Sequence, residues 1–147
     1  MKSATVTEVV TSEVRVRYKE TDRMGVVYHS NFLVWFEVGR VEFLRALGSN
    51  YREMEEGGVF FPVLEVSCKY HQPARFDDRI EIRTRAERIR WARLRFRYEV
   101  LRAEDGALLA EGWTMHAATD SGGTPHRLPE AVLDRIDAVV EGGEVKR

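Results

Sequence analysis

Residues 31–47 are the segment that most restricts the folds open to this chain. Eleven of the seventeen residues are apolar, and the polar ones are thinly spread between them. A helix that is apolar over most of its circumference is expected to be buried rather than to lie on a surface. Ser30 or Asn31 suits its N-cap, and Gly48 suits the position just past its C-terminus. The sequence therefore predicts one long buried helix that the rest of the chain must enclose.

The segments on either side of this helix have the alternating pattern of β-strands. One strand is expected before the helix, over residues 13–18. Four more are expected after it, over residues 64–70, 80–86, 94–100 and 109–117. The last of these is expected to place its odd-numbered residues, Leu109 to Ala117, on one face, with Glu111 out of pattern. A hairpin turn is predicted at residues 104–106.

This order of elements predicts an α+β fold in which an antiparallel sheet of about five strands curves round the helix. Shorter helices are expected around residues 50–56 and, beginning on a proline, over residues 129–140. The chain, residues 1–147, is expected to form one domain with a core over about residues 13–120. A single sheet would leave one face uncovered, so we expect association with another copy.

Composition excludes several classes of function. The net charge of −1 gives no reason to expect binding to DNA or RNA. The longest apolar run, residues 32–36, is too short to span a membrane, and the first residues do not resemble a secretory leader. The single Cys68 excludes an internal disulfide and a cysteine-cluster metal site, which favours a reducing cytoplasm. Four lysines against nineteen arginines, with only three amide side chains, fit either a thermophilic source or a GC-rich genome.

The loop of residues 19–30 carries Asp22 between the first strand and the helix. A helix start presents backbone N–H groups without intrahelical partners and a partial positive charge. A carboxylate beside such donors is the minimum set of groups for attacking a carbonyl and holding the resulting oxyanion. The same aspartate could instead bond a nearby backbone N–H as an Asx-turn. Spacing alone does not decide between the two interpretations.

Four neighbours of Asp22 are candidates for the same site, each with a structural alternative. Gly25 fits a turn that lets backbone approach a ligand, or simply a turn. His29, at the helix entrance, is by default a surface histidine that caps or bonds the loop, and alternatively a neutral ring that polarises or orients a carbonyl. Tyr18 and Tyr28 are by default half-buried aromatics with satisfied hydroxyls.

The remaining candidate groups have mainly structural interpretations. His71, His116 and His126 have no partners at metal-ligand spacing, so no metal site is predicted. Cys68 is in register with apolar neighbours and is expected to be a small buried hydrophobe rather than a nucleophile. Arg90, near a turn, could reach a phosphate, although any exposed hairpin can carry such a residue.

A family resemblance lies in residues 17–32, which read RYKETDRMGVVYHSNF. This segment resembles the signature of the hotdog-fold acyl-CoA thioesterases, and more narrowly that of the 4-hydroxybenzoyl-CoA thioesterase family with its Tol–Pal-associated bacterial branch. The similarity extends over roughly residues 13–120 and includes the strand and turn of residues 70–78. Glu20, where many relatives have aspartate, and Met24, where small residues are common, depart from the pattern. Both departures bear on acyl-group preference more than on chemistry.

The resemblance implies a helix wrapped by a curved sheet, dimers whose sheets join, often tetramers, and an active site at the dimer interface. It implies hydrolysis of acyl-CoA in the cytoplasm, with coenzyme A present only as part of the substrate and with no metal or redox cofactor. The residues implied for the site are Asp22, His29 and Tyr18 for catalysis and Gly25, Tyr28 and Arg90 for substrate binding.

Two alternatives remain open on the same fold. One is a hydratase or dehydratase that acts on acyl thioesters, which would need a His and Asp pair arranged for proton transfer at carbon. The other is a non-catalytic module that binds acyl-CoA or an acyl-carrier protein, because fold does not determine function. The sequence also leaves open whether Asp22 attacks the thioester or activates water, and which acyl group is preferred.

Overall fold

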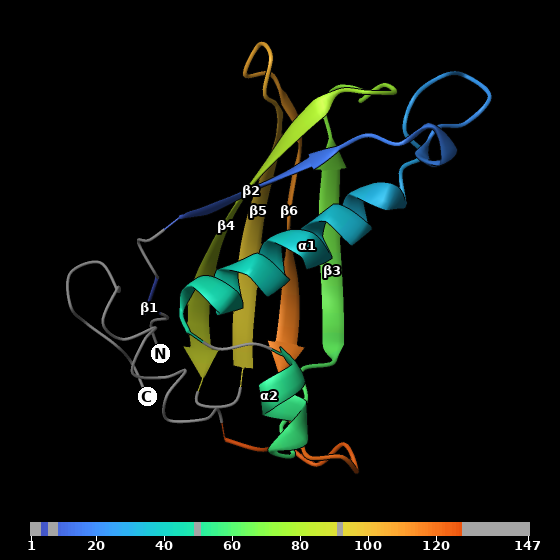
Figure 1. Ribbon diagram of the computed structural model, residues 1–147. Helices are drawn as coiled ribbons and strands as arrows, with labels where there is room; N and C mark the ends of the chain where they lie inside the picture. The colour runs from blue at the N-terminus through green and yellow to red at the C-terminus, as the bar shows by residue number, and fades with distance from the viewer. Residues whose placement is uncertain (1–3, 6–8, 49–50, 91–92, 128–147) are drawn as a thin grey trace.

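The computed structural model of the chain describes residues 4–5, 9–48, 51–90 and 93–127. In chain order the elements are β1 (Ala4–Thr5), β2 (Val10–Arg15), the 3₁₀ helix η1 (Tyr18–Glu20), α1 (Asn31–Ala46), α2 (Tyr51–Glu56), β3 (Val63–Tyr70), β4 (Arg79–Arg90), β5 (Arg93–Arg102) and β6 (Leu108–Ala117). The strands form one antiparallel sheet in the order β1-β4-β5-β6-β3, and β2 also pairs with β4. The helix α1 crosses one face of this sheet (Figure 1), which confirms the α+β prediction. The helix expected over residues 129–140 lies outside the described residues.

Close packing of α1 on the sheet forms the core of the molecule. The ring of Phe36 stacks on the ring of Tyr98, with centroids 4.3 Å apart. A Cβ atom on Gly39 would lie 2.9 Å from Ile82 Cγ2 and closer still to Thr84 Oγ1, so only glycine fits between the helix and β4. The C-terminal end of α1 also follows the prediction, because Gly48 has the positive φ of 83° that suits a residue past a helix end.

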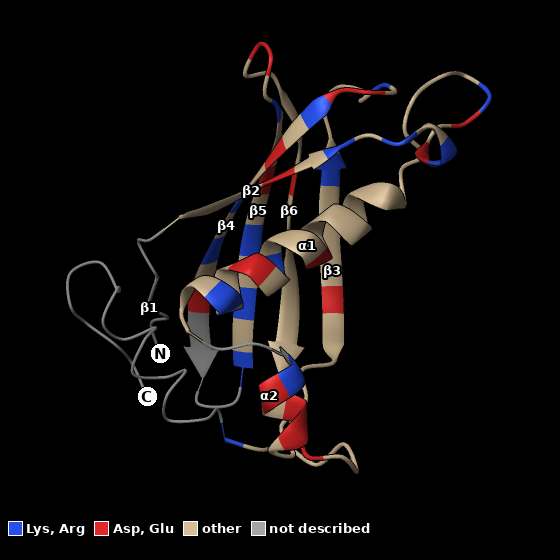
Figure 2. Ribbon diagram, viewed as in Figure 1, with Lys and Arg blue, Asp and Glu red and all other residues tan. Residues whose placement is uncertain are grey.

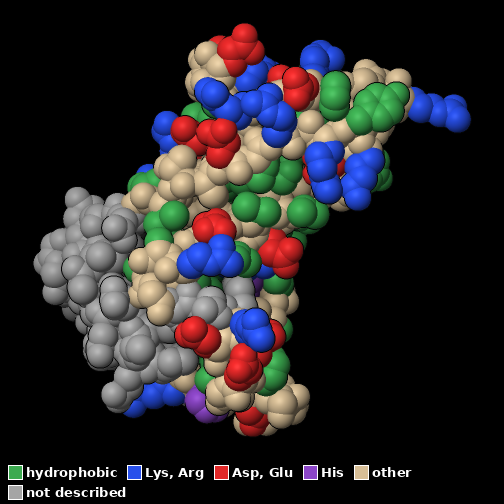
Figure 3. Space-filling model, in the orientation of Figure 1, with side chains coloured by type: hydrophobic (Ala, Val, Ile, Leu, Met, Phe, Trp, Pro, Cys, Tyr) green, Lys and Arg blue, Asp and Glu red, His purple; other side chains and the backbone are tan. Residues whose placement is uncertain are grey.

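Only one side of α1 is buried, which refines the expectation of a helix enclosed all round. The side chains of Leu33 and Val34 are 37% and 47% exposed. Further exposed apolar side chains lie on β3, at Val63, Leu64, Val66 and Tyr70. Figure 3 shows hydrophobic side chains gathered over the middle of this face, between charged groups. Because β3 pairs with β6 alone among the described strands, it also forms one edge of the sheet.

The inward faces of β4 and β5 are those that the alternation predicts. The apolar set on β4, from Ile80 to Ala86, and the set on β5, from Leu94 to Val100, are almost completely buried beneath α1. Arginines and glutamates alternate with these apolar residues along β4 and β5 (Figure 2), so the opposite, outer face of the two strands is highly charged. An antiparallel sheet with one face on the core and one face in solvent has this pattern.

The prediction for β6 was wrong from Ala110 onward, because the even-numbered residues 110–116 face the helix, whereas Leu109, beside a shift in register, is also completely buried. Gly112 pairs with Tyr98, and Thr114 pairs with Phe96, both of which point toward α1. A Cβ on Gly112 would lie 3.0 Å from the ring of Phe36 and closer still to the Ser67 carbonyl oxygen of β3, so only glycine fits at this inward position. Small and polar residues therefore occupy the buried face, which hydrophobic alternation cannot detect.

A buried polar chain explains why polar residues are tolerated on this face. The hydroxyl of Tyr98 lies 2.6 Å from Thr114 Oγ1 and accepts a hydrogen bond from Arg40 at 3.2 Å. Thr114 Oγ1 in turn lies 2.9 Å from His116 Nε2, and the other ring nitrogen of His116 lies 3.2 Å from the Phe61 carbonyl oxygen. Burial, followed by the charge of Arg40, lowers the pKa of His116 to about 4, so its ring is neutral near pH 7. This supports the structural interpretation of His116.

The first strand also differs from its prediction. β2 ends at Arg15, and Tyr18 begins the 3₁₀ helix η1 instead of extending the strand. The turn forms because the Glu20 carboxylate accepts the Arg17 backbone N–H at 2.7 Å. As a result Val16 is buried, whereas the side chain of Tyr18 is 77% exposed.

Candidate active site

The loop between η1 and α1, which carries Asp22, is held by hydrogen bonds within the loop and to the segment before β4. The Asp22 N–H donates to the Val26 carbonyl oxygen at 2.8 Å, and Gly25 adopts a φ of 78° at the tip. The Glu20 carbonyl oxygen accepts the Tyr28 N–H at 2.9 Å. The Val27 N–H donates to the Ala74 carbonyl oxygen at 2.8 Å, which ties the loop to the segment before β4.

The carboxylate of Asp22 forms the Asx-turn that was the structural alternative for this residue. Its Oδ1 accepts the Met24 N–H at 2.8 Å and lies 3.4 Å from the Val26 nitrogen. Its Oδ2 has no hydrogen-bond partner among the described residues. The Asx-turn therefore orients the side chain through one oxygen and leaves the second available.

The backbone donors at the start of α1 are fewer than a helix start implies. The N–H groups of Asn31, Phe32 and Leu33 donate to carbonyl oxygens three residues earlier, at 3.0 to 3.2 Å. The N–H groups of His29 and Ser30 have no hydrogen-bond partner in the described part of the chain. The two consecutive donors available to a ligand therefore belong to His29 and Ser30.

A cavity of ≈310 Å³ lies beside His29. It is lined by Val27, His29, Phe32, Tyr70, His71, Gln72 and Pro73. The Tyr70 hydroxyl donates to the His29 carbonyl oxygen at 3.1 Å, and its ring meets the Phe32 ring edge to face at 5.2 Å. Burial and the neighbouring Cys68 raise the pKa of Tyr70 to about 12, so the phenol stays protonated. In a single copy Asp22 does not line this cavity.

Tyr70 and Cys68 show what a linear sequence could and could not indicate. Tyr70 was not predicted as a site residue, because it lies 41 positions from His29 and only the fold brings the two together. The signals in the sequence were its place on the apolar face of the strand over residues 64–70 and its position in the stretch of residues 70–78 that resembles the family. Cys68 packs against the core and burial raises the pKa of its thiol, which agrees with the prediction that it is not a nucleophile.

The other predicted site residues are only partly brought together. The ring of Tyr28 lies 4.5 Å from the ring of His29, beside the cavity. The ring of Tyr18 instead meets Phe76 edge to face at 5.7 Å. The backbone of Arg90 ends β4 at the other end of the sheet from the loop (Figure 1). Arg79 starts this strand next to Arg15, and the eleven residue-to-residue steps from Arg79 to Arg90, of about 3.3 Å each, span roughly 36 Å.

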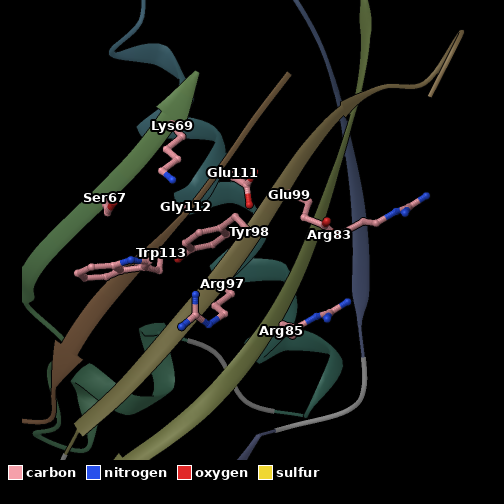
Figure 4. Close-up of a pocket in the computed structure, with 10 residues that line it drawn as sticks. All are labelled: Ser67, Lys69, Arg83, Arg85, Arg97, Tyr98, Glu99, Glu111, Gly112 and Trp113. Carbon is pink, nitrogen blue, oxygen red and sulfur yellow. The ribbon is translucent and has the colours of Figure 1, made fainter. Parts of the chain in front are cut away.

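A second groove, of ≈340 Å³, lies on the outer face of the sheet (Figure 4). Its lining residues include Lys69 from β3, Arg85 from β4 and Trp113 from β6. The guanidinium of Arg95 lies over the Trp113 ring, 4.8 Å from its centroid. None of the predicted site residues lines this groove, so it is separate from the candidate active site.

Metal ligands are not assembled in the described part of the chain, which contains no group of three or more His, Cys, Asp or Glu side chains able to hold an ion. His71 instead lies 2.7 Å from Glu111 in a surface ion pair or hydrogen bond. His126 bonds the neighbouring Arg127 carbonyl oxygen at 2.7 Å. Among the described helices, none is long and apolar enough to cross a membrane.

Comparison with known proteins establishes the family. Residues 16–136 match the family described as the thioesterase-like superfamily, and the chain belongs to it. The match confirms the family-level prediction of a hotdog fold and of an enzyme of the thioesterase class.

Individual relatives and one solved structure are similar to this chain over different shares of its length. YbgC of Escherichia coli O157:H7, named an acyl-CoA thioester hydrolase, is 33% identical over 121 residues, which cover 82% of this chain and 90% of YbgC. YneP of Bacillus subtilis is 44% identical over 72 residues, which span 49% of this chain and only 52% of YneP. The crystal structure of the hypothetical protein TT1821 from Thermus thermophilus is 42% identical, with a TM-score of 0.82, and the match covers 88% of this chain and 98% of TT1821.

Proposed function

We propose that the protein hydrolyses acyl-CoA thioesters to a free acid and CoA, with Asp22 as the catalytic carboxylate. One observation carries the proposal: a single loop holds a carboxylate oxygen without a described partner and, seven residues later, the two unpartnered N–H groups of His29 and Ser30. Acyl transfer needs both a nucleophile or base and an oxyanion site. The activity for which YbgC is named supports the same reaction.

In the proposed mechanism the thioester carbonyl oxygen accepts hydrogen bonds from the His29 and Ser30 N–H groups. Removing one such donor in other enzymes costs on the order of 3 kcal/mol, so this contribution could match that of the carboxylate. Asp22 either attacks the carbonyl carbon and forms an acyl-enzyme anhydride, or takes a proton from the attacking water. In both routes the thiolate of CoA leaves. The proposal requires no metal or redox cofactor, and coenzyme A enters only as part of the substrate.

The neighbouring aromatic side chains have proposed roles in holding the substrate. His29 and Tyr28 would contact the thioester beside the oxyanion site, and Gly25 would allow the loop backbone to approach it. Tyr70 would hold the His29 peptide through its hydrogen bond to the carbonyl oxygen. Tyr18 and Arg90 remain proposed members of the site, and their positions require that a second copy contributes.

We infer a dimer formed through β3 as the smallest active unit. β3 is an edge strand with exposed apolar side chains, and such edges pair readily with another strand. Two β3 strands paired antiparallel about their centres would place residues 60–63 of one copy beside residues 70–73 of the other. Each cavity near His29 would then face a groove of ≈680 Å³ on the other copy, whose walls include Phe60, Phe61 and Pro62. This groove is the proposed place for the acyl group.

Finer assignments remain proposals of the same kind. They comprise membership of the 4-hydroxybenzoyl-CoA branch or its Tol–Pal-associated group, a tetramer built from two dimers, and a cytoplasmic location. A single domain over residues 1–147 and a thermophilic source also stay predictions.

A thiol-release assay over short, long and aromatic acyl-CoAs tests the proposed function. We expect the Asp22→Asn variant to lower kcat on the order of 100-fold or more, because the amide is neither a nucleophile nor a base, while acyl-CoA binding is retained. Asp105→Asn is a matched control, since Asp105 Oδ1 also accepts the N–H two residues on, at 3.1 Å, in a hairpin away from the site. Unchanged release by Asp22→Asn would reject the assignment. Binding of acyl-CoA by the wild type without any thiol release would instead favour the non-catalytic module.

Isotope labelling tests whether Asp22 acts as a nucleophile. A single turnover in ¹⁸O-labelled water, followed by mass spectrometry of the protein, would place label in the Asp22 carboxylate if an anhydride forms and water attacks its aspartyl carbon. Label confined to the product acid would exclude water attack at the aspartyl carbon, and would leave the general-base route or an anhydride that water opens at the acyl carbon.

A further inference from the structure

The buried carboxylate of Glu20 takes no part in the proposed chemistry, although it lies two residues before Asp22. Glu20 is only 5% exposed. Its Oε1 accepts the Arg17 backbone N–H at 2.7 Å. Its Oε2 lies 3.4 Å from Nη2 of the Arg17 side chain, which is 63% exposed. Removing a carboxylate from water is costly, so a buried one generally satisfies a backbone group that has no other partner. The carboxylate of Glu20 therefore holds η1 closed.

The main chain of Glu20 makes a second connection, to the start of α1. Its carbonyl oxygen accepts the Tyr28 N–H at 2.9 Å and the Asn31 side-chain amide at 3.0 Å. One residue thus closes the turn that precedes Asp22 and ties that turn to the first residue of the helix. Thr21 alone separates this connection from Asp22.

The rest of the loop leaves Asp22 little freedom to move independently. Its N–H and Oδ1 are both bonded within the loop, to Val26 and Met24. Thr21 pairs with Val27, directly before Tyr28 and His29. A shift of η1 relative to the helix would therefore change the separation between the Asp22 carboxylate and the His29 N–H.

We propose that Glu20 and Asn31 are positioning residues that hold the Asp22 carboxylate at its working distance from the His29 and Ser30 N–H groups. The inference rests on the proposed function. A misplacement of about 1 Å can lower a reaction rate on the order of 100-fold even when the substrate still binds. The effect of disturbing either residue should therefore fall on kcat rather than on KM.

Steady-state kinetics with one acyl-CoA test this inference, at a temperature where circular dichroism shows each variant to be folded. Glu20→Ala removes the acceptor for the Arg17 N–H and should lower kcat about 10- to 100-fold with KM within about twofold. Glu20→Gln keeps an oxygen for that N–H and should restore most of the lost kcat. Asn31→Ala cuts the same connection from the helix side and should lower kcat about 10-fold. The control is Glu13→Ala, because Glu13 is an exposed residue of β2 that pairs with Arg79. This variant should leave kcat and KM unchanged.

The outcomes separate the inference from the proposed function. An active wild type with unchanged kcat in Asn31→Ala and in folded Glu20→Ala overturns the inference alone. The inference is also overturned if activity falls only in proportion to the folded fraction, because that loss is merely structural. If Glu20→Ala does not fold, Asn31→Ala decides. A wild type that releases no thiol from any acyl-CoA overturns the proposed function, and this inference with it.

Discussion

The loop that carries Asp22 and the contact between α1 and the sheet adjoin one another, yet they are held in different ways. In the loop, the bond from the Asn31 side chain to Glu20 spans 11 positions, and the bond from Met24 to Asp22 spans two. In the core, the bond from Arg40 to Tyr98 spans 58 positions, and Phe36 stacks on the same tyrosine. Local hydrogen bonds shape the interior of the loop, which is anchored to distant segments through Val27 and His29, whereas packing between distant residues shapes the core.

This difference predicts opposite responses to substitution. Side chains at the loop tip contact little, so changing them should affect stability weakly, even where activity is sensitive to loop geometry. Side chains between α1 and the sheet are almost completely buried, so changing them should lower the free energy of unfolding strongly. The predictions that follow compare matched changes in the two regions.

The largest effect is expected for Phe36→Ala. The ring is completely buried, and its loss leaves a cavity against Tyr98 and Gly112, so the free energy of unfolding should fall by about 3–5 kcal/mol. The matched change in the loop is Met24→Ala, which truncates a side chain that is 83% exposed and should cost less than about 0.5 kcal/mol. Denaturant titration measures both values. Equal losses at the two positions would contradict the comparison.

The second effect is a pH dependence that comes from His116. Its pKa in the folded protein is lowered to about 4, against 6.5 for an ordinary histidine. As the pH falls from about 6.5 to 4, His116 therefore becomes protonated in the unfolded chain but stays neutral in the folded protein. The stabilisation is fully present above pH 6.5, and about 3 kcal/mol of it should be lost over this range.

His116→Gln isolates this contribution from that of the carboxylates. Glutamine does not titrate, so the free energy of unfolding of the variant should fall less than that of the wild type between pH 6.5 and 4. Parallel curves for the two proteins would show that His116 gains its proton in the folded state without penalty.

A smaller loss of stability, about 1–3 kcal/mol, is expected for Gly39→Ala. Alanine has the higher helix propensity, but the added Cβ would crowd Ile82 and Thr84. Thr84 Oγ1 is buried without a hydrogen-bond partner among the described residues. Adding Thr84→Ala removes this oxygen and should restore part of the lost stability in thermal unfolding. Additive losses in the double variant would contradict crowding as the cause.

A smaller loss, larger only than that of the Met24→Ala comparison, is expected for Gly25→Ala at the loop tip. No atom lies within 4 Å of the position a Cβ would take, so crowding is absent. Only the positive φ of 78° opposes the change, at a cost of about 1 kcal/mol. Thermal unfolding of this variant beside Gly39→Ala therefore compares backbone strain with steric overlap. A Thr84→Ala background should leave the Gly25→Ala loss unchanged.

The predicted fold was correct where one signal dominated each segment. The apolar density of residues 31–47 identified α1, and the alternation from Leu94 to Val100 identified β5 and its buried face. The predictions for β6 and for the end of the first strand failed, because a single residue in each segment overrode the hydrophobic alternation. Gly112 empties the inward side of β6, and the Glu20 carboxylate turns the chain at Tyr18 before the first strand can extend that far.

The residues of the candidate site likewise fall into those that the sequence could predict and those that only the fold brings together. Asp22, Gly25 and His29 could be named from the sequence because they lie in one short loop. Tyr70 could not, because its hydroxyl reaches the His29 carbonyl oxygen only once β3 lies beside the start of α1. Tyr18 shared the motif but points away, toward Phe76.

The sequence by itself determined the order of α1, α2 and the strands β2 to β6, the buried faces of β4 and β5, and the loop that presents Asp22. Each of these follows from the periodicity of side chains or from hydrogen bonds between near neighbours. Only the tertiary structure decided which face of β6 turns inward, which donors at the start of α1 stay unpaired, and which side chains line the cavity beside His29. These depend on how closely distant segments approach, and that distance is set by packing across the whole core rather than by any local pattern.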